Sequence, residues 1–184
     1  MSAATSVVAR YPSALRLIHW TTVLGILIAY GLTYAEALFA RGSAGRAWIW
    51  WTHISVGLLI LALVCARVMV RGTTPMPPPS AALTPLMHFA SRAAHLALYA
   101  LLFAVPLIGI WLAFLRGNEV SFFGLFTIPA PIPVDRPFGR QVQEVHEWLA
   151  NALIAVAAIH GAAALWHHFV RRDDVLARML PGRR

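Results

Sequence analysis

Histidines recur within the apolar stretch VHEWLANALIAVAAIHGAAALWHH, which runs from Val145 to His168. Two of them, His146 and His160, are fourteen residues apart. At about 100° per residue, fourteen helical steps come within about 40° of four whole turns, so both side chains share one face of a helix, about 21 Å apart along its axis. A neutral imidazole nitrogen is a common metal ligand, and an ionisable group inside an apolar span is costly enough to need a role. The spacing therefore predicts two metal-binding levels on one helix.

Two other histidines supply partners for these two levels. His19 opens an apolar run near the start of the chain, and His53 opens the next run. Because consecutive membrane spans run in opposite directions, these two imidazoles are expected near opposite faces of the membrane. Pairs of neutral imidazoles can occupy the two axial positions of a haem iron. We therefore predict two haem b groups, with His19, His53, His146 and His160 as the axial iron ligands.

Spacing alone leaves the partner of the inner-level histidine open. His95 follows Arg92 by three residues, as His19 follows Arg16, so membrane depth pairs His19 better with His95 than with His160. Two other interpretations of these histidines are interhelical hydrogen bonds and a zinc site, although zinc usually needs tighter clustering and often cysteine or carboxylate partners. The remaining histidines near the inner boundary are expected to be interfacial: His88, His167 and His168.

The composition indicates which elements carry these side chains. Of the 184 residues, 59% are hydrophobic and 12% are charged, and the mean hydropathy is +0.68, which is too apolar for an ordinary soluble domain. Four apolar runs approach or exceed the length that crosses about 30 Å of hydrocarbon as a helix: residues 15–39, 48–70, 93–115 and 145–170. Between residues 116 and 144, prolines should exclude a helix: Pro129, Pro131, Pro133 and Pro137. We predict one all-α domain, residues 1–184, folded as a transmembrane four-helix bundle around the two haems.

The basic residues predict the orientation in the membrane. All fifteen are arginine, and they lie between the apolar runs, which indicates contact with lipid headgroups and argues against a nucleic-acid partner. Because arginine favours the cytoplasmic side, the ten that share a side with both termini predict cytoplasmic termini: Arg10, Arg16, Arg67, Arg71, Arg92, Arg171, Arg172, Arg178, Arg183 and Arg184. The opposite side holds five: Arg41, Arg46, Arg116, Arg136 and Arg140. Five acids offset them: Glu36, Glu119, Asp135, Glu144 and Glu147.

Several short motifs carry a resemblance that covers essentially the whole chain: LIHW at 17–20, THISVG at 52–57, AHL at 94–96, RGN at 116–118, FGL at 123–125, HEWLAN at 146–151 and HGAAALWHHF at 160–169. With these motifs the sequence resembles the bacterial cytochrome b561 family, which shares a broad superfamily with the cytochrome b subunits of nickel–iron hydrogenase and formate dehydrogenase. The resemblance implies that His19 and His160 hold the inner haem and that His53 and His146 hold the outer haem. It leaves His95 as a residue beside the ligands or in a quinone site.

The resemblance also implies a function, namely oxidation of superoxide with transfer of the electrons to ubiquinone in the bacterial inner membrane. The outer arginines would then attract the anion, and the small residues from Gly161 to Ala164 would let a quinone ring approach. No catalytic side chain is predicted, because the haem iron carries the electron. One alternative is a haem b subunit that links a partner dehydrogenase or hydrogenase to the quinone pool. Another, of a different class, is a colourless membrane protein that handles protons or a metal.

Overall fold

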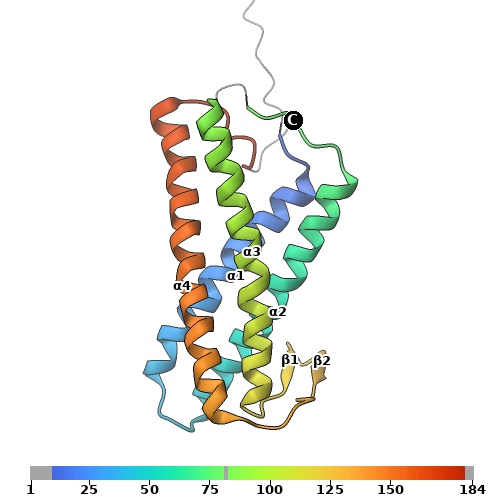
Figure 1. The fold of residues 1–184 in the computed structure, drawn as a ribbon, viewed down its shortest axis with the longest axis vertical. Coiled ribbons are helices and arrows are strands. Elements are labelled where there is room, and N and C mark those ends of the chain that lie inside the picture. Colours follow the sequence, from blue (N-terminus) through green and yellow to red (C-terminus); the bar gives the residue numbers. More distant parts are fainter. Residues whose placement is uncertain (1–9, 81–82, 181–184) are drawn as a thin grey trace, which may run out of the picture.

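The computed structural model of the protein describes residues 10–80 and 83–180, and its main elements are four long helices (Figure 1). Each helix is long and apolar enough to cross a membrane. The predicted transmembrane four-helix bundle is therefore confirmed. The helices are α1 (Ser13–Ala35), α2 (Ala44–Thr73), α3 (Pro85–Leu115) and α4 (Arg136–Trp166).

All four helices begin earlier than the apolar runs predict, and the difference is largest for α3 and α4. The run at 93–115 belongs to a helix that begins at Pro85, and the run at 145–170 belongs to one that begins at Arg136. The expectation that prolines exclude a helix up to residue 144 is therefore wrong for its last part. Pro137 lies in the first turn of α4, where a backbone N–H would have no helical partner in any case. Asp135 caps this turn, because its Oδ1 accepts a hydrogen bond from the Phe138 N–H at 3.0 Å.

A short hairpin that the sequence analysis does not predict follows α3. Strand β1 (Val120–Phe122) pairs antiparallel with β2 (Phe126–Ile128) at the lower end of the bundle in Figure 1, and β1 packs against α2. Ser55 on α2 fixes the hairpin: its hydroxyl donates to the Ser121 carbonyl at 2.9 Å and accepts from the Phe123 N–H at 3.0 Å. Ser55 is fully buried, so these two hydrogen bonds are shielded from solvent.

The four helices differ in how extensively they pack on one another. Helix α1 packs on α2, α3 packs on α4, and α2 packs on α3, whereas α4 packs extensively on neither α1 nor α2 within the described residues. One buried apolar cluster joins three of the helices: Val56, Ile60 and Val64 of α2, Leu102 of α3 and Leu153 of α4. Leu153 is seven residues from both His146 and His160. This cluster therefore lies between the two histidine levels.

The two ends of the described chain meet at one end of the bundle. There the Tyr11 N–H donates to the Arg178 carbonyl at 3.1 Å, and the α2–α3 connection lies at the same end (Figure 1). We call this end inner and the hairpin end outer. Which end faces the cytoplasm stays a prediction, and Arg183 and Arg184, which contribute to it, lie outside the described residues.

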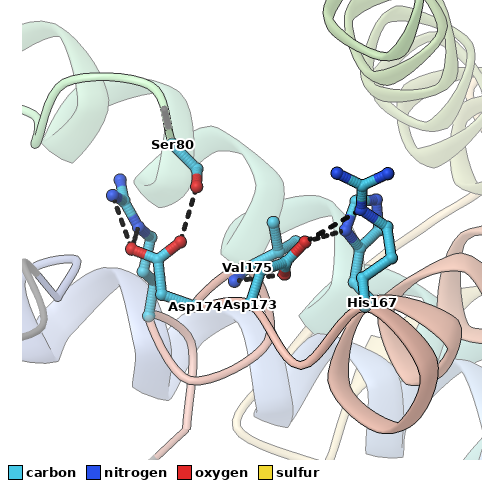
Figure 2. Close-up of polar contacts among 7 residues, drawn as sticks. Ser80, His167, Asp173, Asp174 and Val175 are labelled. Atoms are coloured by element: carbon cyan, nitrogen blue, oxygen red, sulfur yellow. Dashed lines mark hydrogen bonds and ion pairs between the residues drawn. The ribbon is translucent and has the colours of Figure 1, made fainter. Parts of the chain in front are cut away.

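After α4 the chain forms a π-helical turn, His167–Arg171, and folds back across the inner end. Figure 2 shows the contacts that hold it there. The Asp174 carboxylate accepts hydrogen bonds from the Ser80 hydroxyl at 2.5 Å and from the Arg178 guanidinium at 2.7 Å. Arg178 also donates to the Pro78 carbonyl at 2.6 Å. We call Ser80, Asp174 and Arg178 the inner clasp, because together they tie the α2–α3 connection to the end of the chain.

Candidate functional site

The outer level holds a facing pair of imidazoles. The rings of His53 on α2 and His146 on α4 have centroids 6.3 Å apart and planes inclined by 73°. The His53 Nδ1 lies 2.9 Å from the Ala29 carbonyl oxygen. Since a carbonyl only accepts hydrogen bonds, Nδ1 carries the proton, and Nε2 is the nitrogen with a lone pair for a metal.

Glycines give this pair room. A Cβ atom at Gly109 of α3 would lie only 3.0 Å from the His146 Cε1, so the absent side chain is what lets the imidazole lie against α3. Gly57 follows His53 by one helical turn, and a Cβ atom there would meet nothing within 4 Å. Gly161, next to His160, borders similar open space. The His146 imidazole therefore depends on the missing side chain at Gly109 for its place against α3.

The inner level holds three imidazoles. The His160 ring of α4 lies between that of His19 on α1, at 6.4 Å, and that of His95 on α3, at 5.2 Å. Arg67 of α2 enters this group, with its Nη1 3.1 Å from the His19 Nδ1. Its Nε donates to the Tyr99 hydroxyl at 3.0 Å. The structure thus brings together both candidate partners of the inner level.

The separations test whether these pairs fit a haem. Metal–imidazole bonds are about 2.0–2.1 Å long and a ring centroid lies about 1.1 Å beyond its nitrogen, so two imidazoles on opposite sides of one metal have centroids about 6.3 Å apart. The 6.3 Å of His53–His146 and the 6.4 Å of His19–His160 match this value. The 5.2 Å of His95–His160 falls short of it. Both matching pairs also bridge helices that do not pack extensively on one another within the described residues, which suits a group inserted between them.

A basic hollow lies at the outer end, near the His53–His146 pair. It has a volume of about 340 Å³ and is lined by Arg116 at the end of α3 and by Arg136 and Arg140 at the start of α4. We call it the arginine hollow. Arg46, another outer arginine, pairs instead with Glu36 at 2.9 Å. The outer arginines that the sequence analysis treats as one set are therefore divided by the fold.

Acidic side chains lie further along α4. A smaller hollow of about 150 Å³ is lined by Glu144, Glu147, Trp148 and Asn151. At its far side the Tyr30 hydroxyl of α1 donates to the Asn151 Oδ1 at 2.7 Å, one of the polar contacts that bridge α1 and α4. The outer end thus has one hollow lined by arginines and another lined partly by acidic side chains.

Two residues have surroundings that the sequence analysis missed. His167, expected to be an ordinary interfacial histidine, is buried, and its Nδ1 lies 2.6 Å from the Asp173 Oδ2 (Figure 2). Arg67 was counted only as an inner charge, yet it contacts the inner imidazoles. Its position inside the apolar run LLILALVCARVMV was the signal, since an arginine within a span usually lines a site.

Comparison with known proteins places these features in context. Residues 10–182 match the family model described as prokaryotic cytochrome b561. The chain is 34% identical to cytochrome b561 homolog 2 of Escherichia coli K12 over 165 residues, which cover 88% of this chain and 86% of the relative. It is 32% identical over 170 residues to a Yersinia pestis protein named probable superoxide oxidase CybB, covering 91% of this chain and 93% of the relative. Cytochrome b561 homolog 1 of Escherichia coli K12 is 31% identical over 171 residues, with coverages of 91% and 94%.

Proposed function

The chain belongs to the prokaryotic cytochrome b561 family, and from this premise we propose that it moves electrons from superoxide at the outer end of the bundle to ubiquinone at the inner end. The family and the four spans make it an integral membrane protein of electron transfer that binds haem b. This favours electron transfer over the proton- or metal-handling alternative. The number of haems, the donor and the acceptor are the proposal.

Four histidines hold two haems in this scheme. His53 and His146 bind the outer iron, and His19 and His160 bind the inner iron. The centroid separations of 6.3 and 6.4 Å support these pairs. The Ala29 carbonyl holds the His53 Nδ1 and so leaves Nε2 as the nitrogen that would bind a metal. Each haem, when bound, would supply a one-electron iron couple.

The arginine hollow is the main observation in favour of superoxide as the electron donor. Three guanidinium groups around one space attract a small anion, and Arg140 is six residues from His146, which is about 9 Å along α4. The name of the Yersinia pestis relative supports the same donor. The electrons balance when two superoxide ions give two O₂ and two electrons, and one ubiquinone takes two electrons and two protons to form ubiquinol.

The inner end is the proposed place for ubiquinone. His95 is exposed, its ring contacts that of His160, and the Ser91 hydroxyl lies 3.3 Å from its Nδ1. These side chains offer hydrogen bonds to a quinone carbonyl beside the inner level. Lipid surrounds the rest of the bundle, whose exposed side chains along the spans include many large apolar ones.

The test uses the purified, haem-loaded protein in liposomes that contain ubiquinone, with superoxide generated enzymatically outside. We expect ubiquinol to form at one molecule per two superoxide ions and to be abolished by superoxide dismutase. Haem reduction that requires an added partner dehydrogenase, with none from superoxide, would overturn the proposal in favour of a haem b subunit. A colourless preparation without a Soret band would overturn both in favour of the proton- or metal-handling protein.

A further inference from the structure

Arg67 places a positive charge at the inner level. It lies on α2 within the membrane span and is half-buried. Its guanidinium contacts His19 through Nη1 and Tyr99 through Nε, and its Cζ lies 5.9 Å from the centre of the Tyr99 ring. The His160 ring lies 6.4 Å from that of His19 and 5.2 Å from that of His95. One cation thus contacts the group of three imidazoles that forms the inner level.

No carboxylate offsets this charge within residues 10–80 and 83–180. The ion pairs found there are Arg46–Glu36, His167–Asp173, Arg171–Asp173 and Arg178–Asp174, which all lie towards the ends of the bundle. A charge inside a span is costly, and evolution keeps one mainly where it acts on a site. The outer level differs, because the charge of Arg116 that reaches His146 is opposed there by that of Glu147.

Tyr99 is the contact that fixes the guanidinium. Arg67 can donate to the His19 Nδ1 only while that nitrogen carries no proton. Its hydrogen bond to the Tyr99 hydroxyl does not depend on the protonation or ligation of His19. A guanidinium also keeps its charge where an ammonium group would lose it. Arg67 is therefore a permanent cation held at a defined place.

We propose that Arg67 raises the reduction potential of the inner haem above that of the outer haem and so sets the inward direction of electron flow. This rests on the two-haem scheme above. An oxidised haem carries one positive charge more than a reduced haem, so a fixed cation nearby disfavours the oxidised form. The effect is larger in the low dielectric of a membrane protein than in water. Arg67 acts as a positioning charge: it binds neither electron donor nor acceptor.

The test is an optical redox titration of the haem-loaded full chain in detergent, with mediators and without superoxide or quinone. We expect two midpoints in the wild type. Arg67→Gln should lower the higher midpoint by about 59 mV or more, the equivalent of a tenfold change in a one-electron equilibrium, and leave the lower one unchanged. The control is Arg172→Gln, an exposed arginine beyond α4 at the inner end, which should move neither midpoint.

Several outcomes decide the proposal. Unchanged midpoints in Arg67→Gln, or equal shifts of both, would overturn it. If Arg67→Gln fails to incorporate haem, the Tyr99→Phe variant decides instead, because it keeps the charge of Arg67 but removes the hydrogen bond that holds the guanidinium in place. A decrease in the higher of the two midpoints would support the proposal, and unchanged midpoints would overturn it. Haem content, measured as the pyridine haemochrome, is read separately, so one haem per wild-type chain would overturn the two-haem scheme itself. A protein inactive with superoxide can still give the expected shift.

Discussion

The His95 ring of α3 lies edge-on against the His160 ring of α4, with centroids 5.2 Å apart and planes inclined by 70°. Two imidazoles that share one metal from opposite sides need about 6.3 Å between centroids. His95 is therefore too close to His160 to be its partner on one iron, whereas the His19 ring at 6.4 Å is at the right distance. This geometry favours the pairing that the family resemblance implies over the pairing by membrane depth.

Single alanine variants test this assignment. His160→Ala should remove the inner haem or convert it to a high-spin form, while the outer haem persists because its ligands lie about 21 Å away along α4. His95→Ala should keep two low-spin haems, because a neighbour of a ligand tunes a metal site without holding it. Haem content and optical spectra of the two purified variants measure the difference.

The depth-based pairing gives the reverse pattern. In that case His95→Ala loses the inner haem and His160→Ala keeps it. If both variants lost the same haem, neither pairing would stand, because the spectra would then report haem incorporation rather than ligation. The wild type should hold close to two haems per chain, and one haem in a fully loaded preparation would contradict the scheme.

Gly109 tests the outer level without removing a ligand. Because a Cβ atom there would approach the His146 Cε1 to 3.0 Å, Gly109→Val should push the imidazole away from α3. The haem content should fall from two towards one per chain, with the inner haem retained. Gly72→Val, on α2 where a Cβ atom meets nothing within 4 Å, is the control and should keep full haem content. Full content in Gly109→Val would show that His146 does not need this space.

The arginine hollow predicts salt-dependent kinetics. Arg136 and Arg140 are exposed, so replacing both with glutamine should leave the fold intact. Electrostatic steering accelerates association by 10-fold or more, so superoxide-driven ubiquinol formation by the double variant should fall about tenfold at low salt. The difference should shrink at high salt, where the charges are screened. The control is Arg41→Gln, an outer arginine outside the hollow. Equal rates for wild type and double variant at low salt would rule out steering by the hollow.

Orientation is tested with reporters fused after Arg184. Ten arginines on the side of the termini and five on the other predict that the fused end is cytoplasmic. A fluorescent protein should therefore be bright in this position, and an alkaline phosphatase, which needs the periplasm, should be inactive. Fusions into the loop between α1 and α2 serve as the opposite control. Phosphatase activity of the fusion after Arg184 would show that the bundle has the opposite orientation, and the proposed donor and acceptor sides would then be exchanged.

The sequence predicted those features that depend on local periodicity. Fourteen residues between His146 and His160 define one face of a helix, whatever the rest of the chain does, and the apolar runs define four spans. The ligand roles stay predictions. The hairpin was not predictable, because three-residue strands carry little pattern and this one depends on Ser55, which is distant in sequence. The contact between Arg67 and His19 likewise depends on how α1 packs against α2.

The inner clasp predicts how stability depends on pH. Burial raises the pKa of Asp174, but the hydrogen bond from Ser80 and the Arg178 guanidinium lower it by more, so the pKa lies below its ordinary value. A carboxyl group with a lowered folded-state pKa stabilises the fold above the ordinary pKa and loses that contribution as the pH falls through the lowered value. The clasp should therefore be intact at neutral pH and open in acid.

Asp174→Asn removes the charge at all pH values. Arg178 is buried, so its guanidinium would lose the charged partner and keep neutral acceptors such as the Pro78 carbonyl. We expect a loss of about 1–2 kcal/mol, seen as a fall of about 4 °C in the thermal midpoint in detergent at pH 7. The gap between variant and wild type should begin to narrow as the pH falls below the ordinary carboxyl pKa of about 4. It should close as the pH falls through the lowered pKa of Asp174, where the folded wild-type carboxylate becomes protonated. Glu119→Gln, an exposed acid at the outer end, is the control and should shift the midpoint little at any pH. A gap that stays constant from pH 7 to pH 3 would mean that Asp174 stabilises the inner end by shape and not by charge.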